Sequence, residues 1–181
     1  MTTKNLFPIK LVLSLFLIIG INSCSNDDDL PELPPITFNV FCYGPDLQNN
    51  QGVRPAYLEE FLQISSDTYS TQLLITDENI TENSGTLSGT GFAIDLEFFG
   101  NRNTPLQSGT YEINSTQEIG DVNAGFSENY DTGNNLNAIT AFESGFIRVS
   151  PYSTGFYIEI DAVYNTDERF HGIFLGNVTQ L

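Results

Sequence analysis

The sequence predicts an all-β protein: an antiparallel β-sandwich or barrel of about 7–9 strands, with one short helix near the N-terminal side. Two stretches, 92–98 and 156–164, alternate apolar and polar residues, as a strand with one buried face does. Segments rich in Gly, Asn, Asp and Pro separate these stretches from other β-forming ones. The connections are shorter than the dozen or more residues that parallel strands require, so we expect antiparallel pairing.

The folded part is expected to begin near Ile36, where residues 36–43 alternate and favour a strand. A Gly44-Pro45 turn and a polar loop ending at Gly52 follow. Residues 54–64 are the helical candidate, because five apolar residues recur there at helix-like spacing: Tyr57, Leu58, Phe61, Leu62 and Ile64. The remaining strands are expected at 68–76, 92–98, 109–113, 125–130, 145–150, 156–164 and 170–178.

Residues 1–23 have the three parts of a secretory signal. Lys4 and Lys10 precede an apolar run over 11–19, and small or polar residues follow it. The apolar core is roughly a dozen residues long, whereas a membrane-spanning helix needs about 20. We therefore expect a signal peptide that is cleaved, and not a membrane-spanning anchor.

The signal ends in Ile21-Asn22-Ser23-Cys24, which resembles the lipobox of bacterial lipoproteins. The resemblance implies that Cys24 carries a thioether-linked diacylglycerol and an N-linked acyl chain such as palmitate. Several acyl chains on one residue give stable anchoring, whereas a single chain is marginal. Residues 1–23 are thus a lipoprotein signal peptide, 24–35 a lipidated, acidic and proline-rich tether, and 36–181 a single β-rich domain.

A short polar and acidic tract follows the cysteine: Ser25, Asn26, Asp27, Asp28 and Asp29. It resembles the export signal of surface lipoproteins in the Bacteroidota, which directs a lipoprotein to the outside of the outer membrane. The resemblance implies a lipid-anchored protein exposed at the cell surface that is handled by the lipoprotein export machinery. The alternative location is the periplasmic face, with the aspartates simply part of a solvated tether.

Two motifs in the β-rich part carry a second resemblance. Leu106-Gln107-Ser108-Gly109-Thr110-Tyr111 and Ser144-Gly145-Phe146-Ile147-Arg148-Val149 look like the L-x-x-G-T-Y turn and the S-G-x-I-x-V strand of uncharacterised Bacteroidota surface lipoproteins. The resemblance covers about half of the chain, from roughly 96 to 178, and implies a β-sandwich. Because these motifs concern turns and strand patterning, they imply a fold and no function.

Charge excludes one class of partner. The chain carries 23 acidic and six basic residues, and the cleaved leader removes both lysines. Such an acidic surface repels phosphate backbones, and the sequence lacks the basic patch that nucleic-acid binding needs. We therefore expect no nucleic-acid partner, and a domain that stands away from anionic lipid on its tether.

The sequence offers little catalytic chemistry. Its single histidine, His171, is expected at the surface or rim of the sheet, on the face opposite Phe170. Cys42 lies in an apolar, aromatic stretch and is expected to be a buried, inert thiol. One histidine excludes multi-histidine zinc sites, and phosphate-loop, dinucleotide and nucleophile-elbow motifs are missing. We predict a protein that is not an enzyme and needs no metal or cofactor.

Carboxylate pairs are the exception to consider. Asp95 with Glu97, and Glu159 with Asp161, each lie on one side of a predicted strand. If the two strands were neighbours, the four groups would form an acidic cluster suited to cation binding or glycoside hydrolysis. The alternative is a solvated outer face.

The favoured function is a membrane-anchored, non-enzymatic binding or interaction module at the cell surface, with a glycan or a protein as ligand. Tyr130, Tyr152 and Tyr157, near turns or on an outward phase, are the candidate ligand-binding residues. The alternative is an accessory glycan-binding lipoprotein of a nutrient-uptake system, although the sequence has no Trp to stack on sugars. Assembly through exposed edge strands and a carboxylate-dependent glycoside hydrolase are further alternatives.

Overall fold

The computed structural model describes residue 35 and residues 37–134 and 136–181. The predicted signal peptide, Cys24 and the acidic tract lie outside the described residues. Within the described part, no helix has the length and apolar character needed to cross a membrane. The elements are β1 (Val40–Gly44), the 3-10 turn η1 (Pro45–Leu47), β2 (Asn49–Gly52), β3 (Ala56–Gln63), β4 (Tyr69–Thr76), β5 (Thr81–Asn83), β6 (Thr86–Ser88), β7 (Thr90–Gly100), β8 (Gly109–Ile113), β9 (Asp121–Asp131), β10 (Thr140–Ala141), β11 (Ser144–Tyr152), β12 (Gly155–Tyr164), β13 (Glu168–Gly176) and β14 (Val178–Gln180).

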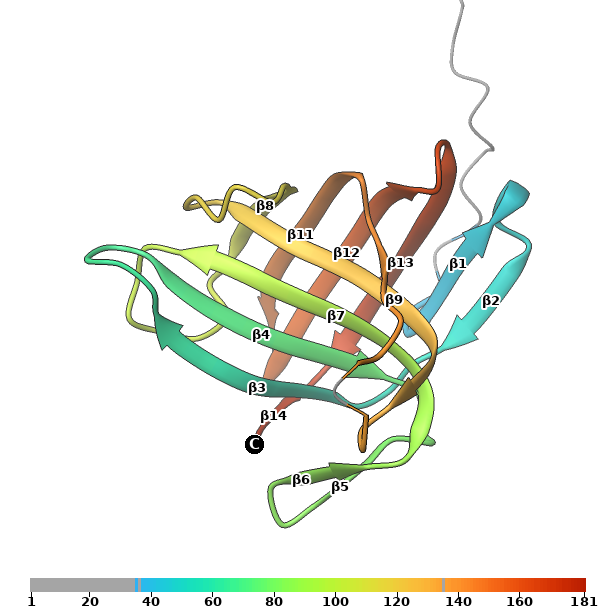
Figure 1. The fold of residues 1–181 in the computed structure, drawn as a ribbon, viewed down its shortest axis with the longest axis horizontal. Helices are drawn as coiled ribbons and strands as arrows, with labels where there is room; N and C mark the ends of the chain where they lie inside the picture. Colours follow the sequence, from blue (N-terminus) through green and yellow to red (C-terminus); the bar gives the residue numbers. More distant parts are fainter. Residues whose placement is uncertain (1–34, 36, 135) are drawn as a thin grey trace, which may run out of the picture.

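One curled sheet makes up most of this all-β fold (Figure 1). Its strands follow the order β14-β3-β4-β7-β9-β8-β11-β12-β13-β1-β2, with β10 paired to β9, while β5 and β6 form a separate hairpin. The sheet curls until β3, β4 and β7 lie across β12 and β13 (Figure 1). Each strand therefore has an inner face toward the opposite half of the sheet and an outer face.

Aromatic side chains fill the space between the two halves. The ring centroid of Phe126 lies 5.0–6.0 Å from those of five other rings: Tyr43, Phe92, Phe142, Tyr164 and Phe170. Burying a phenylalanine side chain contributes roughly 1.5–3 kcal/mol, so this cluster is a main source of stability. At its edge, burial and a 3.0 Å hydrogen bond donated to Glu128 raise the pKa of Tyr43 to about 12.

The C-terminus joins the two halves. After β13 the chain passes through Asn177 into β14, which pairs in parallel with β3 and sets Val178 opposite Ala56. β8 and β9 form a second, two-residue parallel pair. The expectation of wholly antiparallel pairing is wrong. β3 and β14 are far apart in the chain, so no short connection fixes their relative direction, and β8 and β9 pair in parallel over only two residues.

The predicted helix over 54–64 is wrong, and this segment forms strand β3. A β-bulge interrupts its pairing with β4 between Leu58 and Glu60. Leu58 belongs to the core before the bulge, and Phe61 packs against the same core after it. Two inward residues thus lie three positions apart, so the bulge reproduces helix-like spacing within a strand.

The number of strands exceeds the predicted 7–9. The described residues include five short strands of two to four residues each, β2, β5, β6, β10 and β14. They pair through backbone groups and show little apolar alternation: β2 reads NNQG and β5 reads TEN. No side-chain pattern could predict them, and β2 falls within the loop that was expected to end at Gly52.

Candidate functional site

The residues predicted for lipidation and export lie outside the described residues: Cys24, Ser25, Asn26, Asp27, Asp28 and Asp29. The three candidate tyrosines do not meet at one place. Tyr152 and Tyr157 share the outer face of the β11–β12 pair, whereas Tyr130 lies on β9 and packs against the small cluster of Leu74, Ile80 and Ala93.

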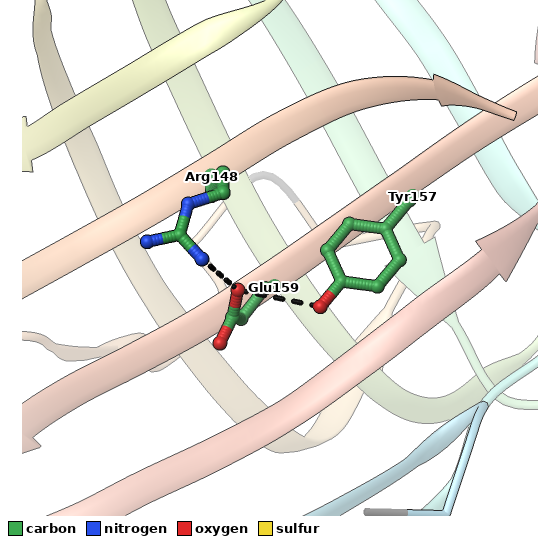
Figure 2. Close-up of polar contacts among 3 residues, drawn as sticks. All are labelled: Arg148, Tyr157 and Glu159. Atoms are coloured by element: carbon green, nitrogen blue, oxygen red, sulfur yellow. Dashed lines mark hydrogen bonds and ion pairs between the residues drawn. The ribbon is translucent and has the colours of Figure 1, made fainter.

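The outer face of β11 and β12, called here the β11–β12 face, carries a fixed polar contact (Figure 2). Nη1 of Arg148 lies 2.7 Å from Oε2 of Glu159, and the hydroxyl of Tyr157 donates to the same oxygen at 3.3 Å. Burial, and then the negative charge of Glu159, raises the pKa of Tyr157, so the phenol keeps the proton it donates. Tyr152 is 56% exposed, which suits stacking on a ligand more than chemistry.

The four predicted carboxylates do not form one cluster, because β9, β8 and β11 separate β7 from β12. The two on β12 each pair with an arginine: Glu159 with Arg148 at 2.7 Å, and Asp161 with Arg169 at 2.9 Å. The two on β7 lie elsewhere, in a groove on the outer face of the other half of the sheet.

This β9 groove has a volume of about 540 Å³. It lies where β9 passes from pairing with β8 to pairing with β10. Its hydrogen-bonding side chains include Gln72, Asp95, Glu97, Asn114, Asn123 and Glu143, and its apolar ones include Ile113, Val122 and Ile139. Of these residues, the sequence analysis singled out only the two carboxylates of β7.

Asp95 and Glu97 are not simply solvated. Nε2 of Gln72 donates to Oδ1 of Asp95 at 3.3 Å. Burial raises the pKa of Asp95, the Gln72 hydrogen bond opposes this shift, and the charge of Glu97 adds to it. Glu97 accepts hydrogen bonds from Ser70 at 2.7 Å and from Asn123 at 3.2 Å, one on each oxygen. The groove thus combines a carboxyl group with a raised pKa and a carboxylate held by two donors.

Two more titratable groups lie near Asp95. Burial raises the pKa of Glu59, the bulge residue of β3, and the charges of Asp95 and Glu60 raise it further. Burial also raises the pKa of Tyr130, with contributions from the charges of Glu59 and Asp95. Tyr130 is therefore coupled electrostatically to the groove rather than to the other candidate tyrosines.

Gly125 lets the chain close over this part of the outer face. It lies opposite Asp95 in the β7–β9 register. A Cβ at Gly125 would lie 2.6 Å from Cγ2 of Ile139 and 2.7 Å from the carbonyl oxygen of Thr140, so only glycine allows β10 this close to β9. A glycine within a strand pattern signals such an approach, so Gly125 is a sequence signal for the groove in addition to the two carboxylates of β7.

His171 and Cys42 both differ from expectation. His171 lies on the face opposite Phe170, as alternation predicts, but it is 5% exposed and hence buried rather than at a rim. His171 lines a small cavity together with Pro35 and Thr37. Cys42 is free and only half-buried, and burial raises the pKa of its thiol. Within the described part of the chain, no group of three or more His, Cys, Asp or Glu residues could hold a metal ion.

The β9 groove and the β11–β12 face are interpreted from their own chemistry. No protein-family model, no curated protein and no solved structure matches this chain.

Proposed function

We propose that this protein is a lipid-anchored, non-enzymatic binding module of the cell surface, whose ligand occupies the β9 groove. The anchoring part of the proposal rests on the lipobox cysteine, Cys24, and on the acidic tract that follows it. The binding part rests on one observation, the convergence of side chains from β4, β7 and β9 into a concave site of about 540 Å³. Ligand sites are typically concave, with a few converging polar groups.

The ligand is polar and either uncharged or positively charged. Asp95, Glu97 and Glu143 line the groove, and its lining includes no Lys, Arg or His. Carboxylate and amide oxygens accept hydrogen bonds from hydroxyl and ammonium groups. The formal net charge of −17 also steers cations toward the protein and anions away from it.

An accessory glycan-binding role in a nutrient-uptake system is the second candidate. It is favoured by the exposed ring of Tyr152, which shares the β11–β12 face with Tyr157. Aromatic rings offer apolar surface on which a sugar ring can stack, and Arg148 and Glu159 next to Tyr157 supply hydrogen-bonding groups.

A carboxylate-dependent glycoside hydrolase is the third candidate, and the pair of Asp95 and Glu97 supports it. The Cα atoms of residues two apart on one strand face lie about 6.5–7 Å apart, a spacing comparable with the separation of the two carboxyl groups in inverting enzymes. Binding is favoured over hydrolysis because both oxygens of Glu97 already accept hydrogen bonds from Ser70 and Asn123. Those bonds compete with activation of a water molecule.

Calorimetry tests whether the groove binds a ligand. The probes are soluble neutral polysaccharides and a linear polyamine. Asn123→Ala should weaken binding of the responding probe about tenfold, whereas Tyr152→Ala on the other face should leave it unchanged. The opposite pattern moves the site to the β11–β12 face and favours the glycan-binding candidate. Release of reducing sugar by the parent, abolished in Asp95→Asn, would contradict a non-enzymatic role.

Protease treatment of intact cells tests the location independently. We expect the native protein to be digested from outside, and a variant with Asp27, Asp28 and Asp29 replaced by alanine to be protected. Protection of both proteins would place the chain on the periplasmic face and overturn the surface location, without bearing on the groove.

A further inference from the structure

Four polar residues form a row across the outer face of β12, β13, β1 and β2. In the register, Asp161 lies opposite His171, His171 opposite Cys42, and Cys42 opposite Asn50. The first three point away from the core, because each follows a residue that belongs to it: Ile160, Phe170 and Phe41. Side chains directly opposite in a ladder have Cβ atoms about 4.5–5.5 Å apart, so the thiol and the imidazole are within reach of one another.

The imidazole of His171 has an unmet hydrogen-bonding group. The residue is 5% exposed, and its Nδ1 is buried without a hydrogen-bond partner among the described residues. Buried polar groups nearly always have a partner, and an exception indicates a missing water, an ion or a functional role. His171 and Cys42 line the same cavity of about 90 Å³, which is where that partner belongs.

The other polar groups of the row already have hydrogen-bond or ion-pair partners, which narrows the choice of partner for Nδ1 of His171. The carboxylate of Asp161 is engaged by Nη2 of Arg169, at 2.9 and 3.2 Å to its two oxygens. The thiol of Cys42 donates to Oδ1 of Asn50 at 3.0 Å. The rest of the cavity lining is the polar pair Thr37 and Asn50 together with apolar residues that include Val40 and Ile173. Among its side chains, the thiol and the imidazole are therefore the donors that suit a soft metal ion.

We propose that this cavity binds a soft monovalent metal ion, Cu(I), between Sγ of Cys42 and Nδ1 of His171. Thiolate ligands select soft ions, and imidazole suits copper. On binding, the Cys42 thiol releases its proton to solvent, and the thiolate balances the single charge of the ion. The resulting complex is neutral, which suits apolar surroundings that penalise an unpaired charge.

The number of donors decides between Cu(I) and zinc. Structural zinc is held by four ligands and catalytic zinc by three protein ligands. The described residues contain no group of three or more His, Cys, Asp or Glu residues able to hold a metal. Cu(I) is stable with two donors, so a facing thiol and imidazole are sufficient for it.

The test uses the full-length chain carrying Cys24→Ser, which leaves Cys42 as the one thiol in the sequence. Cu(I), kept reduced with ascorbate, is titrated in competition with bicinchoninate. We expect one Cu(I) per chain, loss of that binding in Cys42→Ser, and binding weakened roughly tenfold or more in His171→Gln. Asn83→Ala, on the separate β5–β6 hairpin, is the control outside the cavity and should leave Cu(I) binding unchanged.

X-ray absorption of the parent complex gives the ligand set without any substitution in the cavity. One sulfur and one nitrogen neighbour of copper are expected. Sulfur neighbours alone, equal Cu(I) affinity in His171→Gln, or a preference for Zn²⁺ over Cu(I) would each overturn the proposal. Failure of the parent to bind Cu(I) more tightly than Cys42→Ser would leave a trapped water as the partner of His171 and also overturn it.

Discussion

Gly172 lies on β13 directly opposite Phe41 of β1, where the neighbouring atoms leave no room for a side chain. A Cβ at Gly172 would lie 2.5 Å from Cδ1 of Phe41 and 2.6 Å from the carbonyl oxygen of Val40. Both distances are shorter than a normal van der Waals contact. The close packing of β13 against β1 at this position therefore requires glycine, because even the methyl group of alanine would clash.

Gly172→Ala should lower the free energy of unfolding by about 1–3 kcal/mol, the usual cost of overpacking a core. Gly52→Ala is the matched control, because a Cβ at Gly52 meets no atom within 4 Å, and it should change stability by less than about 0.5 kcal/mol. Urea unfolding of both variants measures the difference. Equal stability of the two would show that the β1–β13 contact relaxes freely.

Asp95 is one residue through which pH should change the stability of the protein. Burial raises its pKa in the folded state, so the folded protein holds this proton more tightly than the unfolded chain does. Its stabilising contribution is thus full below the ordinary aspartate pKa of about 3.9 and is lost as pH rises through the folded-state value.

Asp95→Asn should therefore raise Tm at pH 7, because it removes a half-buried charge while Oδ1 can still accept the Gln72 hydrogen bond. The gain should shrink as pH falls toward 4. Glu143→Gln, at an exposed position of the same groove, is the control and should show a smaller change. A Tm lower than that of the parent at pH 7 would contradict the argument.

Among the elements, β3 shows most directly how one inserted residue changes a pattern. Its pairing with β4 is regular up to Leu58 and again from Glu60, which faces Gln72, and Glu59 is the extra residue between them. Without Glu59, the residues before and after the bulge would pair with consecutive residues of β4. Glu59 is therefore the one extra residue that creates the bulge.

Deleting Glu59 should preserve the fold and cost less than about 2 kcal/mol, since every inward residue of β3 keeps its partner. Deleting Gln72 from regular β4 should cost more, because a one-residue slip moves the following side chains to the other face. Thermal unfolding followed by circular dichroism compares the two. Unfolding of the Glu59 deletion would show that the bulge is required.

At the scale of the whole molecule, the predicted lipid on Cys24 and the acidic composition act together. In the proposed lipoprotein, acyl chains would hold the N-terminus at a membrane, while a formal net charge of −17 would keep the domain away from anionic lipid. The outer surfaces of the curled sheet, including the β9 groove, are then open to the surroundings.

Cys24→Ser should move the protein from the membrane fraction to the soluble fraction, because no acyl chain can be attached to serine in this way. Cys42→Ser should leave the distribution unchanged and serves as the control. Fractionation with metabolic labelling by a palmitate analogue measures both. Label retained in Cys24→Ser would contradict lipidation at this residue.

Several strands could be predicted because each has one face against the aromatic core. β4, β7, β8, β11 and β12 lie close to their predicted ranges, where apolar and polar residues alternate. β3 was assigned wrongly because its bulge breaks that period, and the short strands were missed because backbone pairing leaves no mark on side chains. The two-residue period of a strand also predicts that Asp95 and Glu97 lie on one face. Their hydrogen-bond partners Gln72 and Asn123 could not be predicted in this way, because they lie on other strands.

The sequence by itself determined the all-β class, the acidic surface and the motif on which the anchoring proposal rests, because these follow from local pattern and composition. The curling of the sheet decided the rest. Only tertiary structure brings β4, β7 and β9 together as one groove and sets Cys42 opposite His171, residues more than a hundred positions apart. Pairing between distant strands depends on which faces can be buried together, and that is a property of the whole chain.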